Sequence, residues 1–147
     1  NDKFNWTMTY RQDSDIRIPY GSATEIEEES GISGVLKHTF TFDPQTHKSK
    51  RLVAWIASNC GVQSRRDDYV ARLEQFIPID KYGRCGNMTC AKDWKEKDKS
   101  CMDMISDKYK FYLAFENSFC DDYITEKFFK TLPLDVVPVV RGAADYR

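Results

Sequence analysis

Four short apolar runs, separated by helix-like or charged segments, constrain the fold of this 147-residue chain more than any other feature of its sequence. Each run has the length and the composition of a buried strand. Strands that alternate with helical segments in this way are typical of an open parallel α/β sheet. The four runs occupy residues 52–57, 76–79, 110–115 and 136–140. The side chains expected in the core of the sheet are Val53, Ile56, Leu113, Phe115, Val137 and Val139.

Helical patterns occupy the segments between these runs. Residues 65–76 place apolar side chains on one helical face, and residues 125–132 have the signals of a second helix. Residues 91–107 are charged and fit either a helix or an exposed excursion. Residues 22–51 lack sustained periodicity, so we expect a long loop or linker there.

Polar side chains directly follow three of the four expected strands. Open parallel sheets bind ligands at the carboxyl ends of their strands. We therefore expect a binding site at this edge of the sheet. The polar pairs at these strand ends are Ser58-Asn59, Glu116-Asn117 and Arg141-Gly142.

The chain contains five cysteines and two sequons for N-glycosylation, at Asn5 and Asn87. Together they favour a lumenal or extracellular compartment. Cys85 and Cys90 enclose a short polar loop and could pair with each other. The alternative is a zinc site with Cys85, Cys90 and Cys101 as ligands, although no Cys-x-x-Cys pair or nearby histidine supports it. The odd count leaves one thiol free, or paired outside this chain.

The formal net charge of −1 excludes a strong overall field that would attract nucleic acid or an anionic membrane. The sequence contains no apolar run of the roughly 18 residues that a membrane span needs. It begins without Met and stops directly after a strand-like run. We therefore expect the chain to be a fragment of a longer protein.

The densest polar segment joins the third expected strand to the helix that follows. It reads Phe-Glu-Asn-Ser-Phe-Cys-Asp-Asp-Tyr-Ile-Thr-Glu-Lys over residues 115–127. A helix N-terminus attracts anions, Lys127 adds a positive charge, and Glu126 can accept hydrogen bonds from the hydroxyls of a ribose. These features fit a nucleotide site. They fit a helix capped by Asp122 with a surface Glu126–Lys127 pair equally well, and spacing alone leaves both interpretations open.

Further motifs accompany this segment along nearly the whole chain. They are Phe4 to Ile16 with Pro19-Tyr20-Gly21, Ala57-Ser58-Asn59-Cys60 with Arg65 and Tyr69, Tyr82-Gly83-x-Cys85-Gly86, and Val137-Pro138-Val139-Val140-x-Gly142. In this order, they closely resemble the motifs of the Golgi-type α-1,3-fucosyltransferase family, and its invertebrate members in particular.

The resemblance implies a two-domain glycosyltransferase of the GT-B type, whose C-terminal Rossmann-like half holds GDP-fucose. Residues 1–50 would be the end of the N-terminal acceptor domain and a linker. Residues 51–147 would be the GDP-fucose-binding domain, truncated at its C-terminus. The family positions implied for donor binding are Arg65, Asn117, Tyr123, Glu126 and Lys127.

The resemblance also implies a role for each of these positions. Arg65 and Lys127 would neutralise the pyrophosphate, and Glu126 would bind the ribose. Tyr123 and Asn117 would make polar contacts with the donor. Because Arg66 adjoins Arg65, the register at this position is ambiguous by one residue.

The implied reaction transfers L-fucose from GDP-fucose, in α-1,3 linkage and with inversion, to a GlcNAc of an N-glycan or lactosamine-type acceptor. A cationic clamp would stabilise the diphosphate leaving group, and a carboxylate base would deprotonate the acceptor hydroxyl. In the family that base lies upstream of the segment matching residues 4–21. We therefore assign no catalytic residue here and expect the fragment alone to be inactive. The alternatives are a nucleotide-sugar-binding fragment without activity and a small disulfide-framed secreted domain.

The family setting is the Golgi lumen, within a single-pass type II membrane protein whose anchor lies upstream. The resemblance implies no required cofactor, and manganese is expected at most to stimulate activity. Asp13-Ser14-Asp15 has the form of a manganese-binding Asp-x-Asp motif. It falls in a family segment without a known metal role, so we interpret it as a turn or cap.

Overall fold

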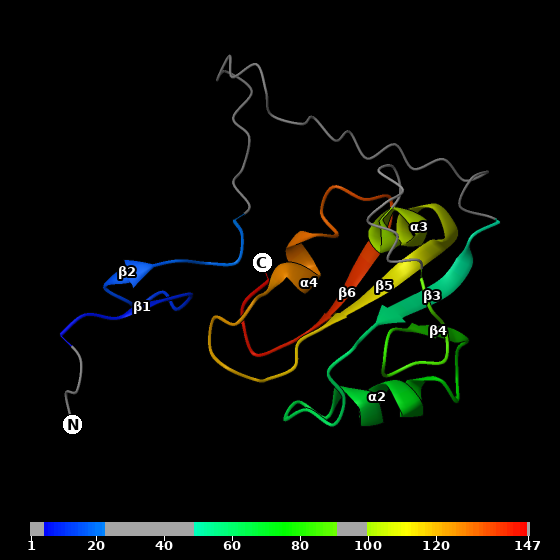
Figure 1. Ribbon diagram of the computed structural model, residues 1–147, viewed down its shortest axis with the longest axis horizontal. Coiled ribbons are helices and arrows are strands. Elements are labelled where there is room, and N and C mark those ends of the chain that lie inside the picture. The colour runs from blue at the N-terminus through cyan, green and yellow to red at the C-terminus, as the bar shows by residue number, and fades with distance from the viewer. Residues whose placement is uncertain (1–4, 23–48, 91–99, 147) are drawn as a thin grey trace, which may run out of the picture.

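The computed structural model describes residues 5–22, 49–90 and 100–146. Its centre is a four-stranded sheet in the order β4-β3-β5-β6, and every neighbouring pair of strands is parallel (Figure 1). The predicted open parallel α/β sheet is confirmed. Its strands are β3 (Arg51–Ile56), β4 (Ile79–Tyr82), β5 (Tyr109–Phe115) and β6 (Val137–Arg141).

Helices cover both faces of this sheet. Figure 1 shows α2 (Arg66–Leu73) on one side, and α3 (Cys101–Lys108) and α4 (Glu126–Phe129) on the other. Val70 of α2 packs into a core with Val53, Trp55, Leu113 and Phe115. On the opposite face, Ile105 of α3 packs into a second core, whose other buried members are Ala54, Tyr82, Tyr109, Tyr112, Ala114 and Val136.

The helix α3 settles part of the interpretation left open for residues 91–107. Ser100 caps this helix by accepting a hydrogen bond from the Asp103 N–H, while the Asp103 carboxylate accepts one from the Ser100 N–H. This reciprocal capping box defines where α3 begins. Residues 91–99 lie outside the described part of the chain.

The second strand begins later in the chain than the sequence predicts. Residues 76–79 were expected to form it, but β4 starts at Ile79. The amides of Phe76 and Ile77 instead donate hydrogen bonds to the Leu73 carbonyl, which continues the turn at the end of α2. Pro78 has no amide hydrogen to give to a ladder, so pairing starts beyond it.

The predicted burial is wrong for Val137 and Val139, and Ile56 is only half-buried. Val137 is 44% exposed and Val139 is 38% exposed, because β6 is the edge strand. The register pairs these valines with Phe111 and Leu113 of β5, on the sheet face that carries α2. Since α2 packs over β3 and β5, no described element covers this face at β6. An apolar hollow of about 350 Å³ lies there.

Residues 5–22 form a small separate pairing, in which β1 (Met8–Thr9) runs parallel to β2 (Ile16–Arg17). The two acidic residues of the Asp-x-Asp motif serve this turn. Asp13 pairs with Arg11 at 2.7 Å, and Asp15 accepts hydrogen bonds from the Thr7 amide and hydroxyl, each at 2.8 Å. Among the described residues, no helix combines the length and the apolar character needed to cross a membrane.

Candidate functional site

A cavity of about 480 Å³, with charged and apolar residues on its walls, opens at the carboxyl ends of β3 and β5, on the face that carries α3 and α4. This volume lies within the range of small-molecule sites. The edge of the sheet is the one that the sequence predicts. The residues lining the cavity are Ile56, Ala57, Ser58, Asn59, Arg66, Cys101, Met102, Tyr112, Asn117, Glu126, Lys127 and Lys130.

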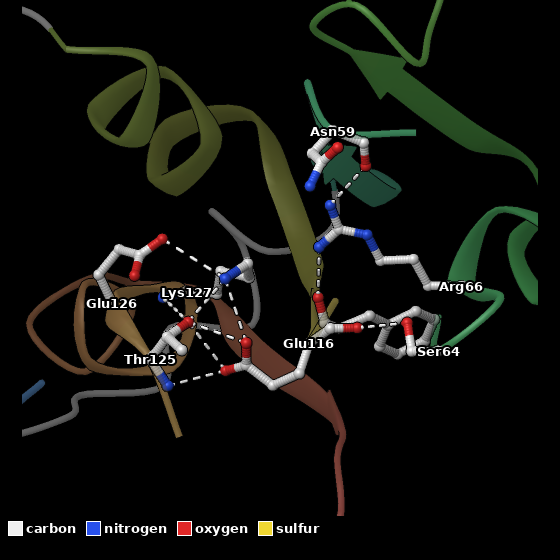
Figure 2. Close-up of polar contacts among 8 residues, drawn as sticks. Asn59, Ser64, Arg66, Glu116, Thr125, Glu126 and Lys127 are labelled. Carbon is white, nitrogen blue, oxygen red and sulfur yellow. Dashed lines mark hydrogen bonds and ion pairs between the residues drawn. The ribbon is translucent and has the colours of Figure 1, made fainter. Parts of the chain in front are cut away.

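Beside the cavity, a buried carboxylate organises the start of α4. Glu116 follows the last residue of β5 and is fully buried. Its carboxylate accepts a hydrogen bond of 2.8 Å from the Thr125 amide, and its two oxygens share the single Thr125 hydroxyl hydrogen, with Oγ1 at 2.9 and 3.0 Å (Figure 2). The loop between β5 and α4 is therefore closed at its base by one side chain.

Thr125, and not Asp122, caps α4. The Thr125 hydroxyl accepts from the Lys127 amide at 3.5 Å, as an N-cap does. Asp122 lies too early in the loop, with a positive φ of 60°, and its carboxylate accepts from the Gln12 amide at 3.1 Å. The predicted helix over residues 125–132 is shortened to Glu126–Phe129, with a turn leading to Pro133.

Lys127 points toward three acceptors at once (Figure 2). Its ammonium lies 2.7 Å from the Thr125 hydroxyl, 3.1 Å from Glu116 and 3.5 Å from Glu126. Burial by itself would raise the pKa of Glu126, but the Lys127 ammonium lowers that pKa below its usual value. Glu126 is therefore an ionised acceptor at neutral pH, and it lines the same cavity as Lys127.

The structure brings Arg66, and not Arg65, to the cavity. Arg66 is 3% exposed, and it donates to the carbonyls of Phe115 at 2.8 Å and Asn59 at 3.0 Å (Figure 2). Its Nε is buried without a partner in the described part of the chain. Arg65 has a left-handed backbone with φ 50°, pairs with Asp68 at 2.9 Å and borders a different hollow.

Asn117 lines the cavity, but Tyr123 does not. The Asn117 Oδ1 is buried and has no hydrogen-bond partner within the described residues, so it is available to a ligand. The Tyr123 ring instead lies 5.0 Å from the ring of Tyr10 and 6.0 Å from that of Tyr20. Burial, together with the neighbouring Tyr20 and Glu116, raises the pKa of Tyr123 to about 12.

The same loop carries polar contacts to the N-terminal segment. In addition to the Gln12–Asp122 bond, Arg11 lies 3.7 Å from Asp121. At the other end of α4, a side chain added at Gly21 would come within 2.5 Å of the Phe129 ring. Residues 5–22 are thus packed against the segment that supplies Glu126 and Lys127 to the cavity.

The Cys85–Cys90 pair that the sequence allowed does not form, because both residues bond to other cysteines. The structure contains disulfides Cys60–Cys85 and Cys90–Cys101, and Cys120 is free and exposed, as the odd count allows. The zinc alternative is excluded since all three of its sulfurs are in disulfides. Cys60, Cys85 and Asp67 lie close together, but the two sulfurs bond each other and are not available to an ion. Asn5 and Asn87, the two sequon asparagines, are both exposed.

Comparison with known families shows which family the chain belongs to. The sequence model described as the C-terminal part of glycosyltransferase family 10 (fucosyltransferase) matches residues 46–147. A second one, described as the fucosyltransferase N-terminal part, matches residues 1–21. The chain belongs to glycosyltransferase family 10.

Several curated relatives resemble this family 10 chain over almost its whole length. It is 40% identical over 97% of its length to alpha-(1,3)-fucosyltransferase C of Drosophila melanogaster, and 42% identical over 97% to glycoprotein 3-alpha-L-fucosyltransferase A of the same organism. It is 36% identical over 95% to human GDP-fucose protein O-fucosyltransferase 3. It covers 35%, 27% and 30% of these proteins, so it spans about a third of the length of the relatives it matches.

A solved structure supports the family 10 fold. It is described as the crystal structure of an alpha1,3-fucosyltransferase with GDP, and it matches 64% of this chain and 26% of its own with a TM-score of 0.53 and 24% identity. This likeness, together with the parallel sheet, is consistent with the predicted GT-B type architecture.

Glu116, Thr125 and Lys130 are not among the site residues predicted from the sequence, although the structure places all three in or beside the cavity. For Glu116 and Thr125, the sequence does contain features that could have indicated their roles. A carboxylate directly after a buried strand needs a partner, and Thr125 precedes the helix by one position. No comparable signal marks Lys130.

Proposed function

We propose that the protein transfers L-fucose from GDP-fucose, in α-1,3 linkage and with inversion, to a GlcNAc of a glycoprotein glycan. In this proposal the chain supplies the donor site. The observation that carries it is the cavity at the ends of β3 and β5, where the cations Arg66 and Lys127 meet the acceptor Glu126. The names of the curated relatives support the same reaction.

The charges of this cavity suit a nucleoside diphosphate. Arg66, Lys127 and Lys130 supply three positive charges on its walls, and the carboxylates beside them are Glu126 and Glu116. Negative charge grows on the diphosphate as the fucosyl bond breaks, and fixed cations stabilise that charge without proton transfer. Glu126 would accept hydrogen bonds from the ribose, and the unpartnered Asn117 Oδ1 would accept one from the donor.

The pyrophosphate role is therefore proposed for Arg66 together with Lys127, in place of Arg65. Tyr123 is proposed to support the loop between β5 and α4 rather than to contact the donor. Residues 1–50 are proposed to end the N-terminal acceptor domain and 51–147 to form the donor domain. The carboxylate base would come from the acceptor domain of the full-length protein.

The proposed compartment is the Golgi lumen, with a membrane anchor in the part of the full protein upstream of this chain. Two disulfides and two exposed sequon asparagines support an oxidising, glycosylating compartment. Manganese would at most stimulate the reaction, because the proposed leaving-group contacts are made by side-chain cations.

A second candidate acceptor is a protein hydroxyl. The relative named GDP-fucose protein O-fucosyltransferase 3 is 36% identical over 95% of the chain, and its name supports a protein acceptor. The donor site would be the same in both cases. Assays of the full-length enzyme on a glycan array and on a panel of folded protein domains, with GDP-fucose as donor, distinguish the two acceptors.

Calorimetric titration with GDP tests the donor site directly. Lys127→Ala should weaken GDP binding at least about tenfold, since it removes a charge-assisted contact. Lys81→Ala is the matched control, because Lys81 pairs with Glu74 at 2.6 Å outside the cavity. Equal GDP affinity in the wild type and Lys127→Ala, with both proteins folded, would refute the proposed donor site.

A further inference from the structure

We propose that Glu116 is a positioning residue that holds the Lys127 ammonium toward the diphosphate of the donor. The proposal rests on the donor site proposed above, but concerns a residue that does not line the cavity. Glu116 would act only through Lys127 and Thr125. This distinguishes it from Glu126, which faces the cavity and would touch the ligand.

The burial of Glu116 is the first step. The residue has no exposed surface, and an isolated carboxylate in such a place is too costly to stay ionised. Lys127 lies 3.1 Å from its Oε2, and supplies the neutralising charge within the described part of the chain. The Thr125 amide and hydroxyl donate further hydrogen bonds to the same carboxylate. A buried charge pair with this many hydrogen bonds specifies one geometry.

The donor count of Lys127 is the second step. An ammonium has three N–H groups, and the structure offers them three acceptors: Thr125 Oγ1 at 2.7 Å, Glu116 Oε2 at 3.1 Å and Glu126 Oε1 at 3.5 Å. All three donors are therefore engaged in this structure. A phosphate can receive a hydrogen bond from Lys127 only if one acceptor gives way.

Glu126 is the acceptor that can give way. Its contact with Lys127 is the longest of the three, and its side chain is 48% exposed, whereas that of Glu116 is not exposed at all. When Glu126 turns to the ribose, the Lys127 N–H that had been donated to Glu126 becomes available to the diphosphate. Glu116 and Thr125 retain the other two donors, so the freed N–H keeps a fixed direction.

This fixed direction has a catalytic consequence. A lysine side chain carries a compact charge on a flexible stem, and it stabilises developing charge best when its position is set before the reaction. Glu116 sets that position from the protein interior. Its loss should therefore affect the turnover number more than the Michaelis constant for GDP-fucose, because the loss is felt most where the leaving-group charge is greatest.

A double-mutant cycle in the full-length enzyme tests the proposal. Glu116→Gln should lower kcat at least about tenfold in the wild-type background and less than about twofold in the Lys127→Ala background. Any effect of Glu116→Gln on GDP affinity, measured by calorimetry, should likewise shrink in the Lys127→Ala background. Similar effects of Glu116→Gln in both backgrounds would overturn the proposal, because the residue would then act independently of Lys127.

Asp80→Asn provides the matched control. Asp80 is another largely buried carboxylate, which accepts from Arg51 and from Tyr109 at 2.5 Å, but it lies outside the cavity. Its replacement should lower the melting temperature and leave kcat unchanged in either background. A fall in kcat of the size seen for Glu116→Gln would show that general loosening of the sheet explains the effect, and would overturn the proposal.

Thr125 gives a second route if Glu116→Gln does not fold. Thr125→Val removes the hydroxyl that binds both Glu116 and Lys127, and Thr125→Ser retains it. The valine variant should lose activity through kcat and the serine variant should recover it; equal activity of the two would contradict the proposal. If Lys127→Ala itself leaves GDP affinity and kcat unchanged, the proposed donor site fails, which is a different outcome from additivity in the cycle.

Discussion

The rings of Tyr10 and Tyr123 lie 5.0 Å apart, centroid to centroid, with their planes inclined at 57°. This contact joins the N-terminal segment to the loop between β5 and α4. Aromatic pairs in such geometries contribute about 1 kcal/mol beyond the area they bury. Tyr10→Ala should therefore open the contact, and speed hydrogen exchange of the Gln12 amide, which donates to Asp122. Met8→Ala, at an exposed side chain of the same segment, should leave that exchange rate unchanged.

The raised pKa of Tyr123, about 12, predicts a specific loss of stability in alkali. The folded state favours the neutral phenol, so this contribution is complete below the usual tyrosine value of 10.0 and is lost as the pH rises toward 12. Tyr123→Phe has no proton to lose. Melting temperatures of a Cys120→Ser protein, with and without Tyr123→Phe, should fall less steeply for the phenylalanine variant between pH 10 and 12. Parallel curves would contradict this prediction.

Adjacent arginines should respond oppositely to replacement. Arg65→Gly removes a left-handed backbone strain of about 1 kcal/mol and loses an exposed ion pair worth less, so the free energy of unfolding should rise by roughly 0.5 kcal/mol. Arg66→Ala leaves two carbonyl acceptors without their charged donor and should cost about 2 kcal/mol. Urea unfolding and GDP titration measure both. Loss of GDP binding in Arg65→Gly would restore Arg65 as the pyrophosphate residue.

Replacement of Glu126 should weaken the binding of the nucleotide but not the binding of bare pyrophosphate. Its carboxylate accepts from Lys127 at 3.5 Å, and it is also proposed to bind the ribose. Glu126→Ala should weaken GDP severalfold, because the ribose loses its acceptor. The same change should leave pyrophosphate affinity unchanged or improve it, since a Lys127 donor is freed. Calorimetry with both ligands checks this, and equal weakening of the two would contradict the exchange of partners at Lys127.

The cysteine pairing predicts a distinct chemical signature. Iodoacetamide should label Cys120 alone in the native protein, and peptide mapping should recover the pairs Cys60–Cys85 and Cys90–Cys101. Loops of these lengths contribute about 3 kcal/mol each, so reduction should lower the melting temperature. In a secretory host, glycosidase treatment should also reveal glycan on Asn87, and on Asn5. Labelling of further cysteines in secreted material would contradict the pairing.

Much of the sheet could be predicted because β3, β5 and β6 each contain a short apolar run. The carboxyl-edge location of the cavity followed from the same runs, since polar residues end β3 and β5. The failures have local causes. Pro78 delays β4, and Val137 is exposed because burial at an edge strand depends on which elements cover it, not on the strand itself. Periodicity within one segment carries no information about coverage by another.

The site was predictable in type but not in detail. Glu126 and Lys127 are adjacent in the sequence and reach the cavity together, whereas Arg65 and Arg66 are also adjacent and diverge. Arg65 has a left-handed backbone, and its side chain pairs with Asp68 beside a different hollow. Arginine rarely adopts a left-handed backbone conformation, so the sequence gives no sign that Arg65 does. The prediction that Tyr123 contacts the donor could not foresee its packing against Tyr10 and Tyr20, because these rings are distant in the chain.

The Cys60–Cys85 disulfide has a consequence for how the cavity can adapt to its contents. It ties the loop after β3, which carries Ser58 and Asn59, to the loop after β4. This disulfide therefore fixes the wall of the cavity that Ser58 and Asn59 form. The opposite wall is a four-residue helix, anchored by the Glu116 network and by the packing of Phe129 against Gly21. A disulfide therefore holds one wall of the cavity, and a buried hydrogen-bond network holds the other, so the cavity has little freedom to change its width for a ligand of different size.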